Sequence, residues 1–151
     1  MFKENKFNYN PSLVVPTEGI VVDCSVTGGN PGYTECRGID LQTKQIVFDE
    51  QIGMATNNIG EILAIVYGAA WVTHSEKKVP VYSDSQICIR WYHNQVIKTN
   101  FFKDYPHIAA QNKNLVHLLE EAAEIMEACR VDIRFWHNKR WGEIPADYNR
   151  K

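Results

Sequence analysis

The sequence predicts an α/β fold with a five-stranded mixed sheet, in which three antiparallel strands are followed by two parallel strands and helices flank the sheet. Three strand-like segments come first and are separated by short turns, which favours an antiparallel meander. Helix-like and strand-like segments then alternate, which is typical of parallel strands joined by crossovers. Because such crossovers are right-handed, the fourth strand should lie beside the first, and the predicted strand order is 3-2-1-4-5.

The first predicted strand is a nearly continuous apolar run at residues 19–26 (GIVVDCSV). Such a run is typical of a central strand that is covered on both faces. Its one acid, Asp23, is unusual for a strand interior. The glycine- and proline-containing stretch at 28–33 predicts a turn, and two further strands are expected at 34–40 and 45–54.

Residues 59–73 are predicted to form a helix, because apolar residues recur at helical spacing. The polar residues 56–58 just before it supply the N-cap. A short buried strand is expected at 79–83 and a second helix at 85–95, followed by a connection at 96–106. This order gives the strand-helix-strand pattern of a parallel crossover.

The C-terminal third is expected to begin with a long amphipathic helix at 108–129, followed by a strand at 131–136. A loop should then lead into a short terminal helix that begins near Pro145. At the other end, polar residues and prolines predict a loosely ordered N-terminal arm at 1–18. The remaining residues, 19–151, are expected to form one domain.

Composition narrows the class of protein. A length of 151 residues with 44% apolar and 23% charged residues is typical of one globular domain. No apolar run approaches the ~20 residues of a spanning helix, and no secretion signal is present, so we expect a cytoplasmic protein without a membrane partner. The four cysteines lack a CxxC pair, which predicts reduced, mostly buried thiols. Because the net charge is −2, nucleic-acid binding would require a local basic patch.

The acid inside the first strand requires a partner, because desolvation of Asp23 would raise its pKa and cost stability without a cation or hydrogen-bond donors. Three acids at strand ends or helix starts are candidates: Glu61, Asp84 and Asp147. Adjacent strands lie ~4.8 Å apart, so Asp23 and Asp84 can reach one metal ion. Local alternatives are a helix N-cap for Asp84, a first-turn acid for Glu61 and a solvated surface carboxylate for Asp147.

Four short motifs carry these acids in a fixed order: Asp23 before GNPG, TNN before Glu61, SDS around Asp84, and AD ending at Asp147. In this order they resemble the ribonuclease H family over residues 19–151. The resemblance implies a ribonuclease H-like fold and an endonuclease that hydrolyses the RNA strand of RNA/DNA hybrids. It implies a two-metal-ion mechanism that leaves 5′-phosphate and 3′-hydroxyl ends. No obligate protein partner is inferred.

The resemblance also implies the metal ligands. Asp23 would bridge two Mg²⁺ ions, with Mn²⁺ as a substitute, Glu61 and Asp84 would complete one ion, and Asp147 would complete the other. Carboxylates suit these hard cations. His137 stands ten positions before Asp147, where the family often places a histidine that assists proton transfer or product release. A loop histidine without chemistry is the equal alternative.

Recognition of the hybrid requires side chains that read the RNA 2′-hydroxyl and hold the DNA strand. Amide side chains suit the first task, and cations with a stacking surface suit the second, although turn and cap chemistry also explains the amides. The residues expected to contact the hybrid are Asn30, Thr56, Asn57, Asn58, Trp91, Lys98, Thr99 and Asn100.

One departure from the family pattern lies between Asp23 and Asn30, where the chain is one residue longer than usual. This insertion predicts a bulge in the first hairpin and a shifted contact to RNA. Two other functions are compatible with the sequence. One is another nuclease of the same fold, such as a junction resolvase or an exonuclease, and the other is a catalytically silent hybrid-binding module.

Overall fold

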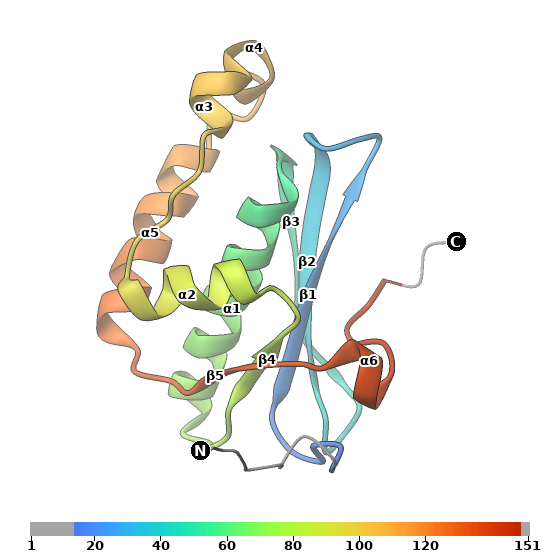
Figure 1. The fold of residues 1–151 in the computed structure, drawn as a ribbon. Helices are drawn as coiled ribbons and strands as arrows, with labels where there is room; N and C mark the ends of the chain where they lie inside the picture. The colour runs from blue at the N-terminus through green and yellow to red at the C-terminus, as the bar shows by residue number, and fades with distance from the viewer. Residues whose placement is uncertain (1–13, 149–151) are drawn as a thin grey trace, which may run out of the picture.

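The protein contains a single mixed sheet, seen in a computed structural model that describes residues 14–148 (Figure 1). The strand order is β3-β2-β1-β4-β5, with β2 antiparallel to β1 and β3, and with β4 parallel to β1 and β5. The predicted order is therefore confirmed. The strands are β1 (Ile20–Thr27), β2 (Gly32–Asp40), β3 (Ile46–Ala55), β4 (Val81–Ser83) and β5 (Ile133–Phe135).

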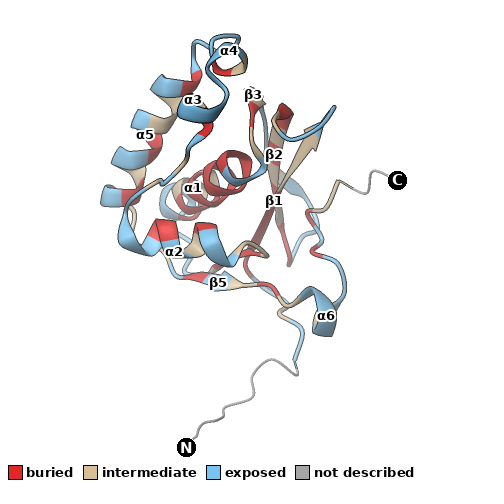
Figure 2. Cartoon of the chain, turned by 45° about the horizontal axis from the view of Figure 1, so that its top comes forward, coloured by how far each residue is buried: buried red, intermediate tan, exposed pale blue. Residues whose placement is uncertain are grey.

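Helices cover one face of this sheet, and α1 lies directly against it with α2 and α5 outside (Figure 1). Every residue of α1 from Ile59 to Val66 is buried, because the sheet and the outer helices enclose this part of the helix (Figure 2). The helices are α1 (Asn57–Ser75), α2 (Gln86–Asn94), α3 (Phe101–Asp104), α4 (Pro106–Ala109), α5 (Leu115–Ala128) and α6 (Asn138–Trp141). Within the described residues, none of them is both long and apolar enough to cross a membrane.

The prediction of one long helix at 108–129 is wrong, because α4 ends at Ala109 and α5 begins only at Leu115. The side chain of Asn112 explains the interruption. Its Nδ2 donates to the backbone oxygens of Ile52 at 2.8 Å and Met54 at 3.0 Å. The segment between the two helices is thus bound to the end of β3, and this tertiary contact takes precedence over the apolar periodicity.

The terminal helix predicted near Pro145 is also absent from the described residues, where 145–146 form a turn and 147–148 have no regular structure. The short helix lies earlier, as α6. The carbonyls of Ala146 and Asp147 accept hydrogen bonds from the Arg37 side chain. They are therefore occupied by a partner on β2 instead of by helical amides. Residues 149–151 of the predicted helix lie outside the described residues.

The segment that follows β5 covers the face of the sheet opposite α1 (Figure 1). A second apolar cluster forms beneath it, separate from the main core under α1, and includes Trp136, whose indole donates to the Gly142 carbonyl at 2.9 Å. This segment therefore packs as part of the domain. The buried members of the cluster are Val21, Leu41, Tyr82, Trp136, Ile144 and Ala146.

The first hairpin differs from the prediction. The β1–β2 register runs without a shift from Ile20 opposite Asp40 to Thr27 opposite Tyr33, so the expected bulge is absent. The extra residue is accommodated in the turn, where Gly28 has a positive φ of 87° that favours glycine. Of the predicted N-terminal arm, residues 14–18 have no regular structure, and 1–13 lie outside the described residues.

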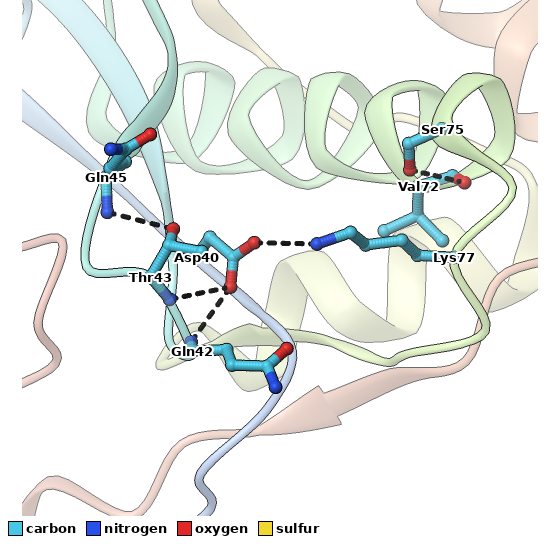
Figure 3. A network of polar contacts seen from close by, with 7 residues as sticks. All are labelled: Asp40, Gln42, Thr43, Gln45, Val72, Ser75 and Lys77. Atoms are coloured by element: carbon cyan, nitrogen blue, oxygen red, sulfur yellow. Dashed lines mark hydrogen bonds and ion pairs between the residues drawn. The ribbon is translucent and has the colours of Figure 1, made fainter.

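One buried acid outside the predicted site, Asp40, has hydrogen-bond donors and a cation around its carboxylate. Asp40 is 4% exposed, and it accepts hydrogen bonds from Lys77 Nζ at 3.1 Å and from the amides of Gln42 and Thr43 at 2.8 and 3.4 Å (Figure 3). Burial alone would raise the pKa of Asp40, but these donors lower it below its ordinary value. The network ties the β2–β3 turn to the end of α1.

Candidate active site

Three carboxylates meet where β1, α1 and β4 come together. Asp23 lies in β1, Glu61 lies in α1, and Asp84 follows β4 directly. One oxygen from each lies within 4.8 Å of the others. Asp23 is 8% exposed and Glu61 5% exposed, whereas Asp84 is half-buried. The fold therefore brings together three of the four predicted acids and can hold a divalent cation between them.

Local helix chemistry does not explain these acids. The N-cap of α2 is Ser85, whose Oγ accepts from the Cys88 amide at 3.2 Å, so Asp84 is not the cap. The N-cap of α1 is Thr56, and Glu61 stands in the second turn, beyond the reach of a first-turn effect. Both local alternatives are wrong, because neither acid caps a helix or lies in a first turn.

Gly60 lets α1 approach the sheet closely enough to bring Glu61 to Asp23. A Cβ at Gly60 would lie 2.8 Å from Cys24 Sγ and 2.8 Å from Thr34 Cγ2, which is closer than real contacts allow. The thiol of Cys24 also donates to the Asn57 carbonyl at 3.4 Å. The first turn of α1 is thereby fixed against β1.

The buried acids repel one another in the absence of a cation. Burial first, and then the charge of Asp84, raises the pKa of Asp23 to about 7. Burial and the charges of Asp23 and Asp84 raise the pKa of Glu61 well above its ordinary value. Glu61 Oε1 is buried with no hydrogen-bond partner among the described residues. In contrast to Asp40, which has a lysine partner, Glu61 has an elevated pKa although the Cys24 thiol lowers it in part. An all-oxygen donor set fits Mg²⁺ or Mn²⁺.

Asp147 is not a member of the group of three. It is half-buried in the segment after α6, and its charge also contributes to raising the pKa of Asp23. Its amide donates to the Ile144 carbonyl at 2.9 Å. The fourth acid is therefore close enough to act on Asp23 electrostatically, and it is less exposed than a solvated surface carboxylate would be.

His137 and its neighbour Asn138 differ in what they contact. The His137 ring packs edge-on against Phe135 and Trp141, with centroids 4.7 and 5.0 Å away, and burial together with the Arg140 charge lowers its pKa. Its predicted role in proton transfer stays a prediction. Asn138 Nδ2 instead donates to Asp84 Oδ2 at 3.0 Å. The sequence analysis missed Asn138, and its only signal was its position beside the predicted histidine.

All eight residues expected to contact the hybrid line one hollow. Asn30 Oδ1 accepts from the Asn57 amide at 2.9 Å, which joins the β1–β2 turn to the start of α1. Trp91 is 8% exposed, so most of its ring belongs to the core. The remaining lining comes from the α3 region, which the sequence analysis did not include: Phe101, Asp104 and Tyr105.

The strand order, the strand directions and the meeting of acids from β1, α1 and β4 match the topology that the motif order implied. The chain has a ribonuclease H-like fold. The sequence matches no protein-family profile. Topology alone carries the assignment.

Solved structures of three ribonuclease H proteins are similar to this chain. The N-terminal ribonuclease H domain of a Mycobacterium tuberculosis protein, solved as a fusion with maltose-binding protein, is 16% identical with a TM-score of 0.49, covering 81% of this chain and 89% of that one. Ribonuclease H1 from Halobacterium salinarum is 19% identical with a TM-score of 0.49, covering 80% and 83%. A ribonuclease H1 isolated from compost by a metagenomic approach is 18% identical with a TM-score of 0.48, covering 82% and 88%.

Proposed function

We propose that this protein is an endonuclease that hydrolyses the RNA strand of RNA/DNA hybrids with the help of two divalent cations. The observation that carries the proposal is the meeting of three mutually repelling carboxyl groups at one point, where Asp23 and Glu61 are buried and Glu61 Oε1 has no hydrogen-bond partner among the described residues. Such an arrangement costs stability unless a cation occupies it. The order of the acid motifs in the sequence supports a ribonuclease as the enzyme class.

Asp23, Glu61 and Asp84 would hold one ion, and Asp147 together with Asp23 would hold the other. The ions, Mg²⁺ with Mn²⁺ as a substitute, would supply activation of the attacking water and stabilisation of the leaving 3′ oxygen, which yields 5′-phosphate and 3′-hydroxyl ends. The role of the protein itself would be to hold the four carboxylates in place. Asn138 orients Asp84 through its hydrogen bond.

The hollow lined by Asn30, residues 56–58 and residues 98–100 supports a nucleic-acid substrate. Its amide and hydroxyl groups offer both donors and acceptors, which suits the 2′-hydroxyl that distinguishes RNA from DNA. Lys98 adds a cation for a backbone phosphate. Because Trp91 is mostly buried, we assign it to the wall of the hollow and expect only limited stacking.

A cleavage assay tests the proposal. Purified protein is incubated with labelled RNA/DNA hybrid, duplex RNA, duplex DNA and a four-way junction, each with Mg²⁺ or with chelator. We expect Mg²⁺-dependent cutting of the RNA strand of the hybrid alone, with 5′-phosphate ends. The variants Asp23→Asn and Glu61→Gln should reduce cleavage to background. Asp132→Asn, which removes an exposed acid on the approach to β5, is the matched control and should retain activity.

Other outcomes would assign a different function. Preferential cutting of the four-way junction would identify a resolvase of the same fold, and progressive shortening from a free end would identify an exonuclease. Tight hybrid binding without Mg²⁺-dependent products would identify a silent binding module. Each of these results would contradict the proposed activity.

A further inference from the structure

Arg37 is the strand residue that faces both Asp23 and the segment that carries Asp147. It lies in β2, and its Cα is paired with that of Asp23 across the β1–β2 ladder. The preceding pair on the same face, Val21 and Ile39, packs in the cluster under the C-terminal segment. Because side chains alternate along a strand, Arg37 and Asp23 project toward that segment as well.

The guanidinium of Arg37 donates hydrogen bonds to two consecutive backbone carbonyls, those of Ala146 and Asp147. Its Nε donates to the Ala146 carbonyl at 2.9 Å, and its Nη2 donates to the Asp147 carbonyl at 2.7 Å. Its Cζ lies 4.5 Å from the centre of the Tyr148 ring. Three consecutive residues of the C-terminal segment are therefore fastened by one side chain on β2.

A second polar side chain, Asn138, joins the same segment to the acid cluster. Asn138 joins Asp84 to the Ile144 amide, with distances of 3.0 and 2.9 Å. Arg37 and Asn138 together fix residues 144–147 relative to the three clustered acids. Of the two, Arg37 alone touches the backbone of Asp147 itself.

We propose that Arg37 is a positioning residue that sets Asp147 beside Asp23 and thereby determines how tightly the protein binds its second divalent cation. This inference rests on the proposed function. Arg37 acts through Asp147 and does not contact an ion. Its planar fork reaches two carbonyls at once while it stacks on Tyr148, which the single ammonium of lysine cannot reproduce.

The first test measures the docking of the segment without metal or nucleic acid. Hydrogen exchange followed by mass spectrometry is compared for peptides covering residues 142–148 in the wild-type protein and in Arg37→Ala. We expect exchange there to become at least roughly 10-fold faster, because the two side-chain hydrogen bonds are lost. Arg134→Ala, which removes an arginine of β5 bonded to Asp132, is the matched control and should leave these peptides unchanged.

The second test counts Mn²⁺ ions by calorimetry, again without nucleic acid. We expect two binding events in the wild-type protein. In Arg37→Ala the tighter event should be unchanged, while the weaker one should lose roughly 10-fold in affinity, as for other outer partners of metal ligands. Arg37→Lys should fall between the two, and it keeps the charge should the alanine variant fail to fold. Asp147→Asn should add little to Arg37→Ala, since both act on the same ion.

Several results would overturn the inference. Unchanged exchange at residues 142–148 would show that Arg37 does not hold the segment, and unchanged affinity at the weaker site would show that its contacts do not affect the ion. Equal weakening of both binding events with a lowered melting temperature would indicate a merely structural role. A wild-type protein that binds a single ion would contradict it too. Because neither test uses cleavage, a failure of the proposed nuclease activity remains distinguishable.

Discussion

Asn138 donates a hydrogen bond from Nδ2 to Oδ2 of Asp84 at 3.0 Å. The same side chain accepts from the Ile144 amide at 2.9 Å. The acid that follows β4 is thereby linked to the segment that leads to Asp147. An outer hydrogen bond of this kind holds a carboxylate in one orientation for a metal ion.

Replacement of Asn138 by alanine should therefore lower kcat/KM for hybrid cleavage by roughly 10- to 100-fold and raise the Mg²⁺ concentration needed for half-maximal activity. Both quantities follow from Mg²⁺ titrations of cleavage rate. Asn94→Ala, at an exposed position at the end of α2, is the control. Equal activity of Asn138→Ala and wild-type protein at limiting Mg²⁺ would show that the contact to Asp84 has no catalytic consequence.

The metal-free protein should lose stability as the pH rises. The pKa of Asp23 is raised from 3.8 to about 7, so between these values the folded protein binds more protons than the unfolded chain. The unfolding free energy therefore falls as pH increases through this window, and the stabilisation is fully present only at lower pH. Thermal melting with chelator, from pH 5 to pH 8, measures the decline.

The same reasoning predicts how a mutation and a metal ion change the dependence of stability on pH. Asp23→Asn should flatten the pH dependence and raise the metal-free melting temperature at pH 8 by roughly 4 °C or more, because a buried charge is removed. Mg²⁺ should stabilise the wild-type protein at pH 8 and have little effect on the variant. Asp132→Asn should keep the wild-type slope. A wild-type melting temperature that is constant from pH 5 to pH 8 would contradict the raised pKa.

Gly60→Ala should weaken metal binding more than its cost in stability suggests. The added Cβ meets Cys24 and Thr34 at 2.8 Å, so the start of α1 must move away from β1 and carry Glu61 with it. Gly68→Ala, in the same helix but two turns from Glu61, is the matched control, since its Cβ would lie 3.0 Å from Val22 of β1. Calorimetry with Mn²⁺ should show weaker binding for Gly60→Ala alone. Equal Mn²⁺ affinity of both variants would show that the close contact at Gly60 does not affect metal binding.

Lys98→Gln should reduce hybrid affinity and make it less dependent on salt. Lys98 lines the hollow beside the start of α1, where a phosphate contact would release one counterion. The slope of log K against log salt concentration should decrease in magnitude by about 1, as measured by fluorescence anisotropy with Asp23→Asn protein to prevent cleavage. Lys113→Gln, exposed before α5, is the control. An unchanged slope would show that Lys98 does not contact a phosphate of the hybrid.

Hydrophobic periodicity and turn residues were sufficient to predict the sheet, because each strand and helix carries its own local pattern. The apolar run around Asp23 indicated a central strand, and the alternation that follows residue 56 indicated the parallel crossovers. The same periodicity failed at 108–129. There the Asn112 side chain binds the β3 backbone, and a contact between segments so far apart leaves no local signal.

The sequence by itself determined the strand order and pointed to the three acids that meet, Asp23, Glu61 and Asp84, since apolar spacing sets the elements and the motifs mark the acids. Only the tertiary structure decided that Ser85 and not Asp84 caps α2, and that Glu61 is buried with its Oε1 unpartnered among the described residues. It also decided that Arg37 holds the Asp147 segment from 110 positions away. The physical reason is that burial and long-range hydrogen bonds depend on which surfaces meet on folding, whereas caps and periodicity depend only on neighbours along the chain.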